Sequence, residues 1–232
     1  MGSSLTWHAE AVIPGVKLVI LGRQGAGKGT QAVRLSHHYV VPHISTGDLF
    51  RAAATAGTEA GLHAKKIMDA GDLLPDDIVI KVVQERLDAD DTRHRGFLLD
   101  GFPRRIPQAE ALDDMLAPEQ LDAVVDLEVP TQLVLDRLAG RGQCIDCRTT
   151  FATDQPLAKS GVCDLCGGPV AVRSDDTVAA ITRRLELYEQ QTAPLVDWYD
   201  TRSLLIRIDA VGSPEEVTAR VIAAVDGRSS PA

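Results

Sequence analysis

The amino-acid sequence predicts an α/β fold, in which helices cover both faces of a parallel β-sheet. Short apolar segments of strand length recur along the chain, and segments with helical periodicity separate them. With 232 residues, 44% of them hydrophobic but only 4% aromatic, the chain can bury a largely aliphatic core in one large domain. The predicted strands cover residues 18–21, 40–44, 97–100, 124–129 and 204–208.

A glycine-rich turn follows the first predicted strand and leads into a helix that we expect to end near His38. Glycines at 22, 25, 27 and 29 allow backbone N–H groups to converge on one point, beside the positive end of the helix dipole. Lys28 adds a full positive charge. The spacing matches G-x-x-x-x-G-K, although the hydroxyl residue, Thr30, comes one position late. This pattern predicts a loop that binds the phosphates of a nucleotide. The alternative, an ordinary glycine-rich turn, is disfavoured by the flanking strand and helix.

Helical patterns fill most of the chain between the predicted strands. Residues 48–70 predict two alanine-rich helices, broken near Gly57 and Gly61. A capping box at 213–216 predicts a closing helix over 214–225, with a frayed tail after it. The other predicted helices cover residues 75–87, 107 onward, 131–138, 177–188 and 194 onward.

Composition excludes several classes of protein. A formal net charge of −9 disfavours nonspecific binding to nucleic acid or to anionic membranes. No apolar run reaches about 18 residues, so we expect no transmembrane helix. Residues 1–16 lack the features of a secretory signal and are interpreted as a loose extension. Residues 1–6 match a myristoylation pattern, but arginine outnumbers lysine 18 to 6, which is more typical of bacteria. We therefore expect a cytoplasmic protein.

All four cysteines fall in one polar segment, residues 142–172, that interrupts the alternation of strands and helices. Two C-x-x-C pairs are separated by fifteen residues, a spacing typical of tetrahedral zinc sites. Disulfides are the alternative, disfavoured because no export signal is present. A redox C-x-x-C would not need a second copy. The predicted ligands are Cys144, Cys147, Cys163 and Cys166.

Together these motifs resemble the adenylate kinase family, in its bacterial form with a zinc-bearing lid, from about Lys17 to the last helix. The late threonine, at the Gly29-Thr30 step, is the form that this family uses. The run Asp-Gly-Phe-Pro-Arg is typical of nucleoside monophosphate kinases. The motifs lie, in the family's order, at residues 22–30, 45–48, 100–104 and 173–176, with the cysteine pairs before the last.

The resemblance implies a P-loop three-layer core with a five-stranded parallel sheet and two small inserts. The core would comprise residues 17–44, 75–140 and 175–226. A helical lobe for the nucleoside monophosphate would span 45–74, a lid with the metal site 141–174, and a tail 227–232. A monomer is expected.

The resemblance also implies a reaction, ATP·Mg²⁺ + AMP ⇌ 2 ADP, with the lid closing over the bound nucleotides. Thr46 and Gln108 would recognise the AMP adenine, Arg137 would stack on the ATP base, and Asp48 and Asp100 would act on magnesium through water. The implied catalytic residues are Lys28, Arg104, Arg137, Arg141, Arg173 and Arg184. ATP would contact Gly25, Ala26, Gly27, Lys28, Gly29, Thr30, Arg137 and Arg141. AMP would contact Thr46, Arg51, Leu74, Gly101, Arg104, Gln108, Arg173 and Arg184.

Some positions depart from the family's pattern. Arg148 replaces a usual glycine, Ala152 a common histidine, and residues 179–181 read Ala-Ala-Ile instead of Glu-Thr-Val. These departures concern the lid. Because Thr46 and Gln108 favour AMP without settling the choice, a kinase for UMP, CMP or GMP remains an alternative, as does a zinc-ribbon binding module on an inactive nucleotide-binding domain. Other basic side chains match no motif and are expected on the surface or at the rim of the site: Arg23, Arg105 and Arg183.

Overall fold

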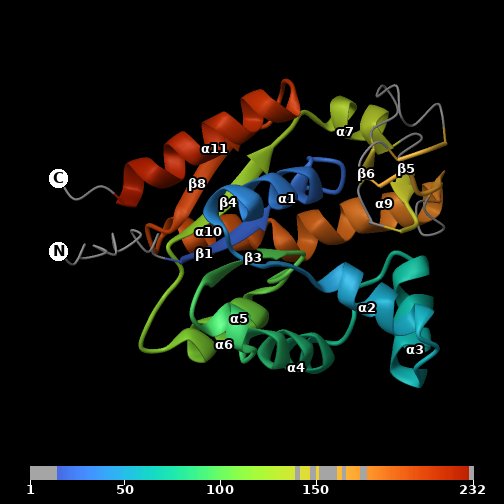
Figure 1. Cartoon of the computed structure of the whole chain (residues 1–232), viewed down its shortest axis with the longest axis horizontal. Helices are drawn as coiled ribbons and strands as arrows, with labels where there is room; N and C mark the ends of the chain where they lie inside the picture. The colour runs from blue at the N-terminus through green and yellow to red at the C-terminus, as the bar shows by residue number, and fades with distance from the viewer. Residues whose placement is uncertain are drawn as a thin grey trace, which may run out of the picture.

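A five-stranded parallel sheet forms the centre of the molecule (Figure 1). The structure, a computed structural model, describes residues 15–138, 142–146, 150–151, 161–163, 166–172 and 177–229. The strands lie in the order β2-β3-β1-β4-β8, and every neighbouring pair is parallel. The α/β prediction is therefore confirmed, with five strands in the sheet. The strands are β1 (Val16–Leu21), β2 (His43–Ser45), β3 (Gly96–Asp100), β4 (Ala123–Glu128) and β8 (Leu205–Asp209).

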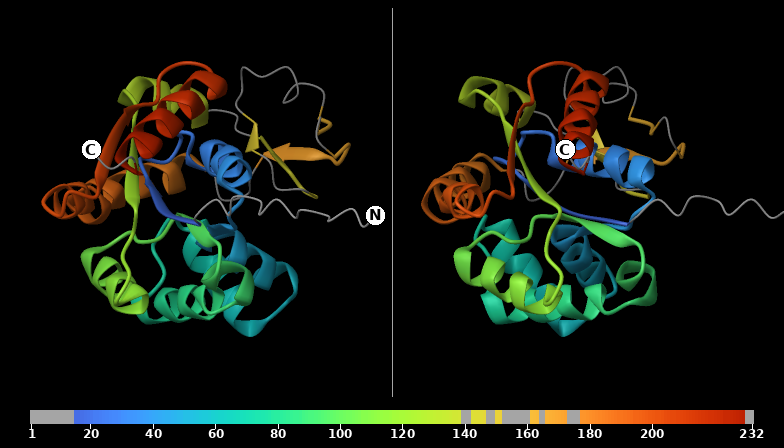
Figure 2. Two further views of the ribbon diagram at one scale, coloured as in Figure 1. Left: turned by 60° about the vertical axis from the view of Figure 1, so that its left-hand side comes forward. Right: turned by 90° about the vertical axis from the view of Figure 1, so that its left-hand side faces the viewer.

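Helices cover both faces of this sheet, and the alternation of side chains along β1 shows why (Figure 2). Leu18 and Ile20 enter one apolar cluster, with α1 (Lys28–Tyr39) and α11 (Pro214–Ser229). Val19 and Leu21 point to the opposite face and enter another. A strand segment that is buried on both faces must be apolar, as β1 is from Leu18 to Leu21, whereas Lys17 near its start is only partly buried. The second face is covered by α4 (Asp76–Leu87), α6 (Ile106–Leu116) and α10 (Pro194–Asp200), and α5 (Asp90–Arg93) precedes β3.

Two short helices, α2 (Thr46–Thr55) and α3 (Glu59–Asp69), form a small lobe beside the sheet (Figure 1). The break between them lies near Gly57, as predicted. The expected break at Gly61 is wrong, because Gly61 lies inside α3. A Cβ there would come within 2.2 Å of the Ala53 backbone, so the glycine allows α3 to pack closely against α2.

A second small unit follows α7 (Thr131–Leu138). It contains an antiparallel sheet in the order β6-β5-β7, made of β5 (Gly142–Cys144), β6 (Thr150–Phe151) and β7 (Val170–Val172). The chain then returns to the main sheet through α9 (Val178–Leu187), which continues as a π-helix, η1 (Tyr188–Thr192), and as α10. The sequence predicted α9 and the start of α10, but not the π-helix that joins them.

The closing helix begins as predicted and ends later. Ser213 Oγ accepts a hydrogen bond from Glu216 N, and Glu216 Oε2 accepts one from Ser213 N, which completes the capping box. The expected frayed tail is helical as far as Ser229. Val225 is buried in the core, and Arg228 Nη2 donates to Leu205 O at 2.9 Å, so these contacts extend the helix. None of the helices in the described part of the chain is both long and apolar enough to cross a membrane.

Candidate active site and metal cluster

A cavity of about 1460 Å³ opens at the carboxyl ends of the central strands. The register brings these ends together, because Asp100 on β3 pairs with Ile20 on β1 and with Ser45 on β2. Ligands of open α/β sheets bind at this edge. The predicted nucleotide-site residues that the structure describes all line this cavity: Gly25, Ala26, Gly27, Lys28, Gly29, Thr30, Thr46, Asp48, Arg51, Leu74, Asp100, Gly101, Arg104, Gln108, Arg137 and Arg184.

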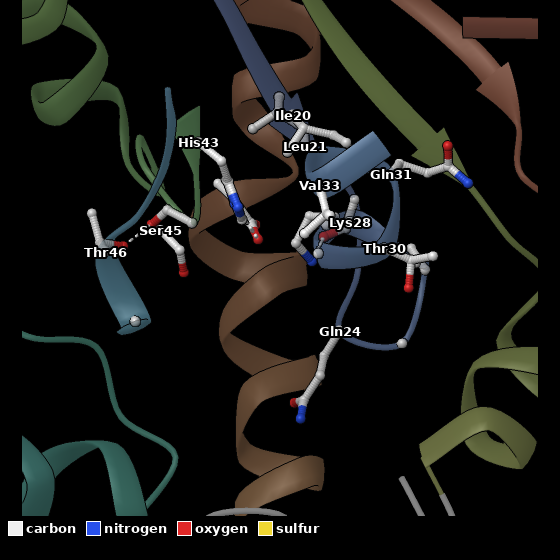
Figure 3. A pocket seen from close by; sticks show the side chains of 18 of the residues that line it. Ile20, Leu21, Gln24, Lys28, Thr30, Gln31, Val33, His43, Ser45 and Thr46 are labelled. Atoms are coloured by element: carbon white, nitrogen blue, oxygen red, sulfur yellow. Dashed lines mark hydrogen bonds and ion pairs between the residues drawn. The ribbon is translucent and has the colours of Figure 1, made fainter. Parts of the chain in front are cut away.

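The predicted phosphate-binding loop, residues 22–27, connects β1 to the N-terminus of α1. Gly22, Gly25 and Gly27 all have positive φ, and a Cβ on Gly22 would come within 2.9 Å of Leu127 O. Only glycine fits this close approach without strain. Lys28 curls inside the loop, where its Nζ donates to Gly22 O at 2.6 Å and to Arg23 O at 2.9 Å (Figure 3). The ammonium group therefore lies inside the loop, held by two of the loop's carbonyl oxygens.

Asp100 faces this loop from the end of β3. His43 Nε2 lies 3.8 Å from Asp100 Oδ2, and His43 and Lys28 point toward the same space (Figure 3). Burial acts to raise the pKa of Asp100, but the interaction with His43 and the charges of Lys28 and Arg104 outweigh it and lower the pKa. Asp100 is therefore an ionised, mostly buried carboxylate among cations. His43 belongs to no sequence motif, because only the pairing of β2 with β3 brings it next to Asp100.

A second group of polar side chains lines the cavity on the side of the α2–α3 lobe. Thr46 Oγ1 donates to Gly101 O at 3.0 Å. Arg51 donates to Asp48 Oδ1 through Nη2 at 2.6 Å and through Nε at 3.2 Å. Arg51, predicted to hold the AMP phosphate, and Asp48, predicted to act on magnesium through water, thus form an ion pair one turn apart on α2.

The segment after β3 continues this polar group. Arg104 Nε donates to Gly101 O at 2.9 Å, and Arg104 N donates to Gln108 Oε1 at 2.8 Å. Thr192 Oγ1, from the π-helix, donates to Arg104 O at 3.0 Å. Gly101 has a φ of 81°, and a Cβ there would come within 3.0 Å of Thr46 Oγ1. The glycine therefore lets α2 approach the Arg104 segment.

Two more predicted arginines reach the cavity from elements distant in sequence. Arg137, on α7, donates to Ala26 O at 3.4 Å and to Ala210 O at 3.3 Å, so its guanidinium lies against the phosphate-binding loop. Arg184, on α9, donates to Met68 O at 2.8 Å and so connects α9 to the α2–α3 lobe. The other two predicted arginines, Arg141 and Arg173, lie outside the described residues, as do Arg148 and Ala152.

Three arginines that matched no motif form ion pairs with residues of other segments. Arg23 pairs with Glu189 on the π-helix at 2.7 Å, and Arg183 pairs with Asp72 at 2.8 Å. Arg105 is partly buried between Asp76 and Gln191. No local motif marks these contacts, because the four partners named here lie at least 29 positions away along the chain.

Beneath the loop, the buried Asp126 on β4 is only 5% exposed, and its Oδ1 has no hydrogen-bond partner among the described residues. Burial, with repulsion from Glu128, raises the pKa of Asp126 to about 6, against the opposing charge of Lys28.

The cysteine cluster, Cys144, Cys163 and Cys166, has sulfur atoms that all lie within 4.8 Å of one another. Cys144 Sγ and Cys166 Sγ are 3.5 Å apart, whereas thiolates on one tetrahedral zinc lie roughly 3.8 Å apart. Cys144 and Cys163 are buried and Cys166 is exposed. Three thiols this close suit a soft divalent ion, so the donor set fits zinc. The fourth predicted ligand, Cys147, lies outside the described residues.

Comparison with known proteins agrees with this geometry. The sequence model described as adenylate kinase matches residues 20–204. An adenylate kinase of Acidothermus cellulolyticus is 51% identical over 213 residues, which cover 90% of this chain and 98% of that protein. Adenylate kinases of Carboxydothermus hydrogenoformans and Streptomyces avermitilis are 50% and 47% identical, over 89% and 90% of this chain and 97% of each protein. The family that the sequence motifs predicted is thus confirmed, and this chain belongs to the adenylate kinase family.

Proposed function

We propose that this chain is an ATP:AMP phosphotransferase, which moves a phosphoryl group reversibly between Mg-ATP and AMP and forms two ADP. The observation that carries the proposal is one continuous cavity with two differently built ends. The phosphate-binding loop and Arg137 stand at one end, and Thr46, Arg51 and Gln108 stand at the other. Two nucleotides can therefore meet with their phosphates between them.

The cations of the cavity suit phosphoryl transfer without a covalent intermediate. Such transfer depends on in-line positioning and on positive charge around the transferred group, more than on a strong base. Lys28 would hold the outer ATP phosphates together with the loop N–H groups. Arg104 and Arg184, with Arg141 and Arg173, would surround the transferring group. Arg51 and Arg104 would hold the AMP phosphate, and Arg137 would also stack on the ATP base.

Asp100 and Asp48 are the carboxylates that we assign to magnesium, through its bound water. Asp100 fits this role because its pKa is lowered, so that it stays ionised among the cations of the loop. Carboxylate oxygens suit a hard cation that keeps most of its water. Bound with ATP, magnesium would neutralise charge that develops on the phosphate oxygens.

We also propose that Cys144, Cys147, Cys163 and Cys166 hold one structural zinc in the lid, residues 141–174. Four thiolates would close the coordination sphere and leave no position for catalysis. The zinc would bind together two turns that have little apolar core. Gln143, next to Cys144, lines the cavity, so the metal site and the nucleotide site adjoin. Free thiols of this kind suit a reducing compartment, which favours the cytoplasm.

The choice of AMP over other monophosphates rests on Gln108 and Thr46. An amide offers one donor and one acceptor side by side, which matches the edge of adenine. The test compares AMP, UMP, CMP and GMP as acceptors with Mg-ATP as the donor. We expect kcat/KM for AMP to exceed that for each other acceptor by about a hundredfold or more, because unmatched polar groups are strongly rejected. Preference for UMP, CMP or GMP would overturn the assignment to AMP.

A further inference from the structure

Gln108 is held on both sides by groups that fix which way its amide points. It is only 2% exposed and lines the cavity. Its Oε1 accepts from Arg104 N at 2.8 Å, and its Nε2 donates to Asp76 Oδ1 at 2.6 Å. A backbone N–H can only donate, and an ionised carboxylate can only accept. Turning the amide over would replace both hydrogen bonds by contacts between like groups.

Asp76 is itself held in place by Arg105, which is held in turn by Gln191. Arg105 Nη1 donates to the same Asp76 oxygen at 3.0 Å, and Arg105 Nε donates to Gln191 Oε1 at 2.6 Å. The side chains of Asp76 and Arg105 are each 27% exposed, so both are partly withdrawn from water. Gln191 belongs to the π-helix, and π-helical turns often occur at functional sites. The chain of bonds runs from the π-helix through Arg105 and Asp76 to Gln108.

The orientation of this amide matters because one lone pair of Oε1 and one hydrogen of Nε2 remain available to pair with the base of a bound nucleotide. Adenine offers an amino donor beside the N1 acceptor. Hypoxanthine and guanine offer the reverse, an oxygen acceptor beside an N1–H donor. An amide locked in one orientation can pair with only one of these patterns, whereas a free amide can turn over and pair with either.

We propose that Asp76 is a specificity-determining residue, which locks the Gln108 amide in the orientation that recognises adenine and rejects 6-oxopurines. The inference rests on the proposed function, in which Gln108 recognises the AMP base. Asp76 is a positioning residue, because it acts on the substrate only through Gln108.

The experiment compares AMP with IMP, which differ only at this edge of the base. For Asp76→Ala we expect a rise in KM for AMP and a fall of about tenfold in the ratio of kcat/KM for AMP to that for IMP, the value of one hydrogen bond. KM for Mg-ATP should not change. The matched control is Asp77→Ala, because Asp77 is exposed in the same first turn of α4 and carries the same charge. The control should keep the wild-type ratio.

A second variant, Asp76→Asn, removes the negative charge of residue 76 but keeps an oxygen that can accept a hydrogen bond from Gln108. In Asp76→Asn, the Arg105 N–H groups should orient the new amide with its oxygen toward Gln108, so we expect most of the AMP:IMP ratio to remain. A loss as large as in Asp76→Ala would overturn the acceptor argument. If Gln108→Leu lowers the ratio and Asp76→Ala does not, this inference is wrong and the proposed function stands. If the wild-type chain does not phosphorylate AMP, or if Gln108→Leu leaves the ratio unchanged, the role of Gln108 in the proposed function fails.

Discussion

The nucleotide cavity and the cysteine cluster are both sites made of converging side chains, but different forces hold them together. Beneath the cavity, two large apolar clusters fill both faces of the sheet. Among the described residues of the cysteine segment, the apolar cluster contains Cys144 and Cys163, with Val170 partly buried against them. Burial of apolar surface can place the cavity residues, whereas so small a cluster cannot order a lid. We therefore expect the lid to depend on its metal and the cavity to be independent of it.

Loss of a metal ligand should give the largest difference between the two regions. In Cys144→Ser we expect bound zinc to fall from about one per chain to near zero. Structural zinc contributes most of the folding free energy of such small units, so proteolysis within residues 142–172 should become much faster. The sheet should keep its cooperative thermal transition, and a chelator should act on the wild-type chain in the same way. A metal-free wild-type chain, or global unfolding of the variant, would contradict the separation of the two regions.

A smaller effect should come from the buried carboxyl group of Asp126, beneath the cavity. Its pKa is raised in the folded state to about 6, from 3.8, so the folded chain holds the proton more tightly than the unfolded chain. Stability is therefore lost as pH rises between these two values, by about 2–3 kcal/mol once Asp126 is ionised. Asp126→Asn removes this loss, so the variant should be more stable than wild type at pH 8 and not at pH 4.

Denaturant unfolding at the two pH values measures this difference. Asp114→Asn is the control, because Asp114 is exposed on α6 and its substitution removes the same charge. Equal gains in both variants, or a gain for Asp126→Asn that persists at pH 4, would show that burial of Asp126 is not the cause. The rate of proteolysis within the lid should be the same in both variants.

The difference between the two regions also shows what the sequence could predict. The turn at Gly22–Lys28, the capping box and the C-x-x-C spacing are local, so they could be interpreted without knowing the fold. Gly61 was misjudged because its role depends on the Ala53 backbone of another helix. The contacts of Arg105 could not be predicted for the same reason, since Asp76 and Gln191 lie 29 and 86 positions away. Contacts of this kind arise only when the sheet and its helices have come together.

The measurement that tests the central claim most directly uses ADP and magnesium as the only substrates. An adenylate kinase must convert ADP into ATP and AMP in equal amounts, because the phosphoryl group that leaves one ADP is transferred to another. We expect the wild-type chain to do so, and Lys28→Ala to lower kcat by about a hundred- to a thousandfold, the usual loss when a group that stabilises transition-state charge is removed. The thermal stability of that variant should be close to that of wild type. A folded, zinc-loaded wild-type chain that leaves ADP unchanged would contradict the account.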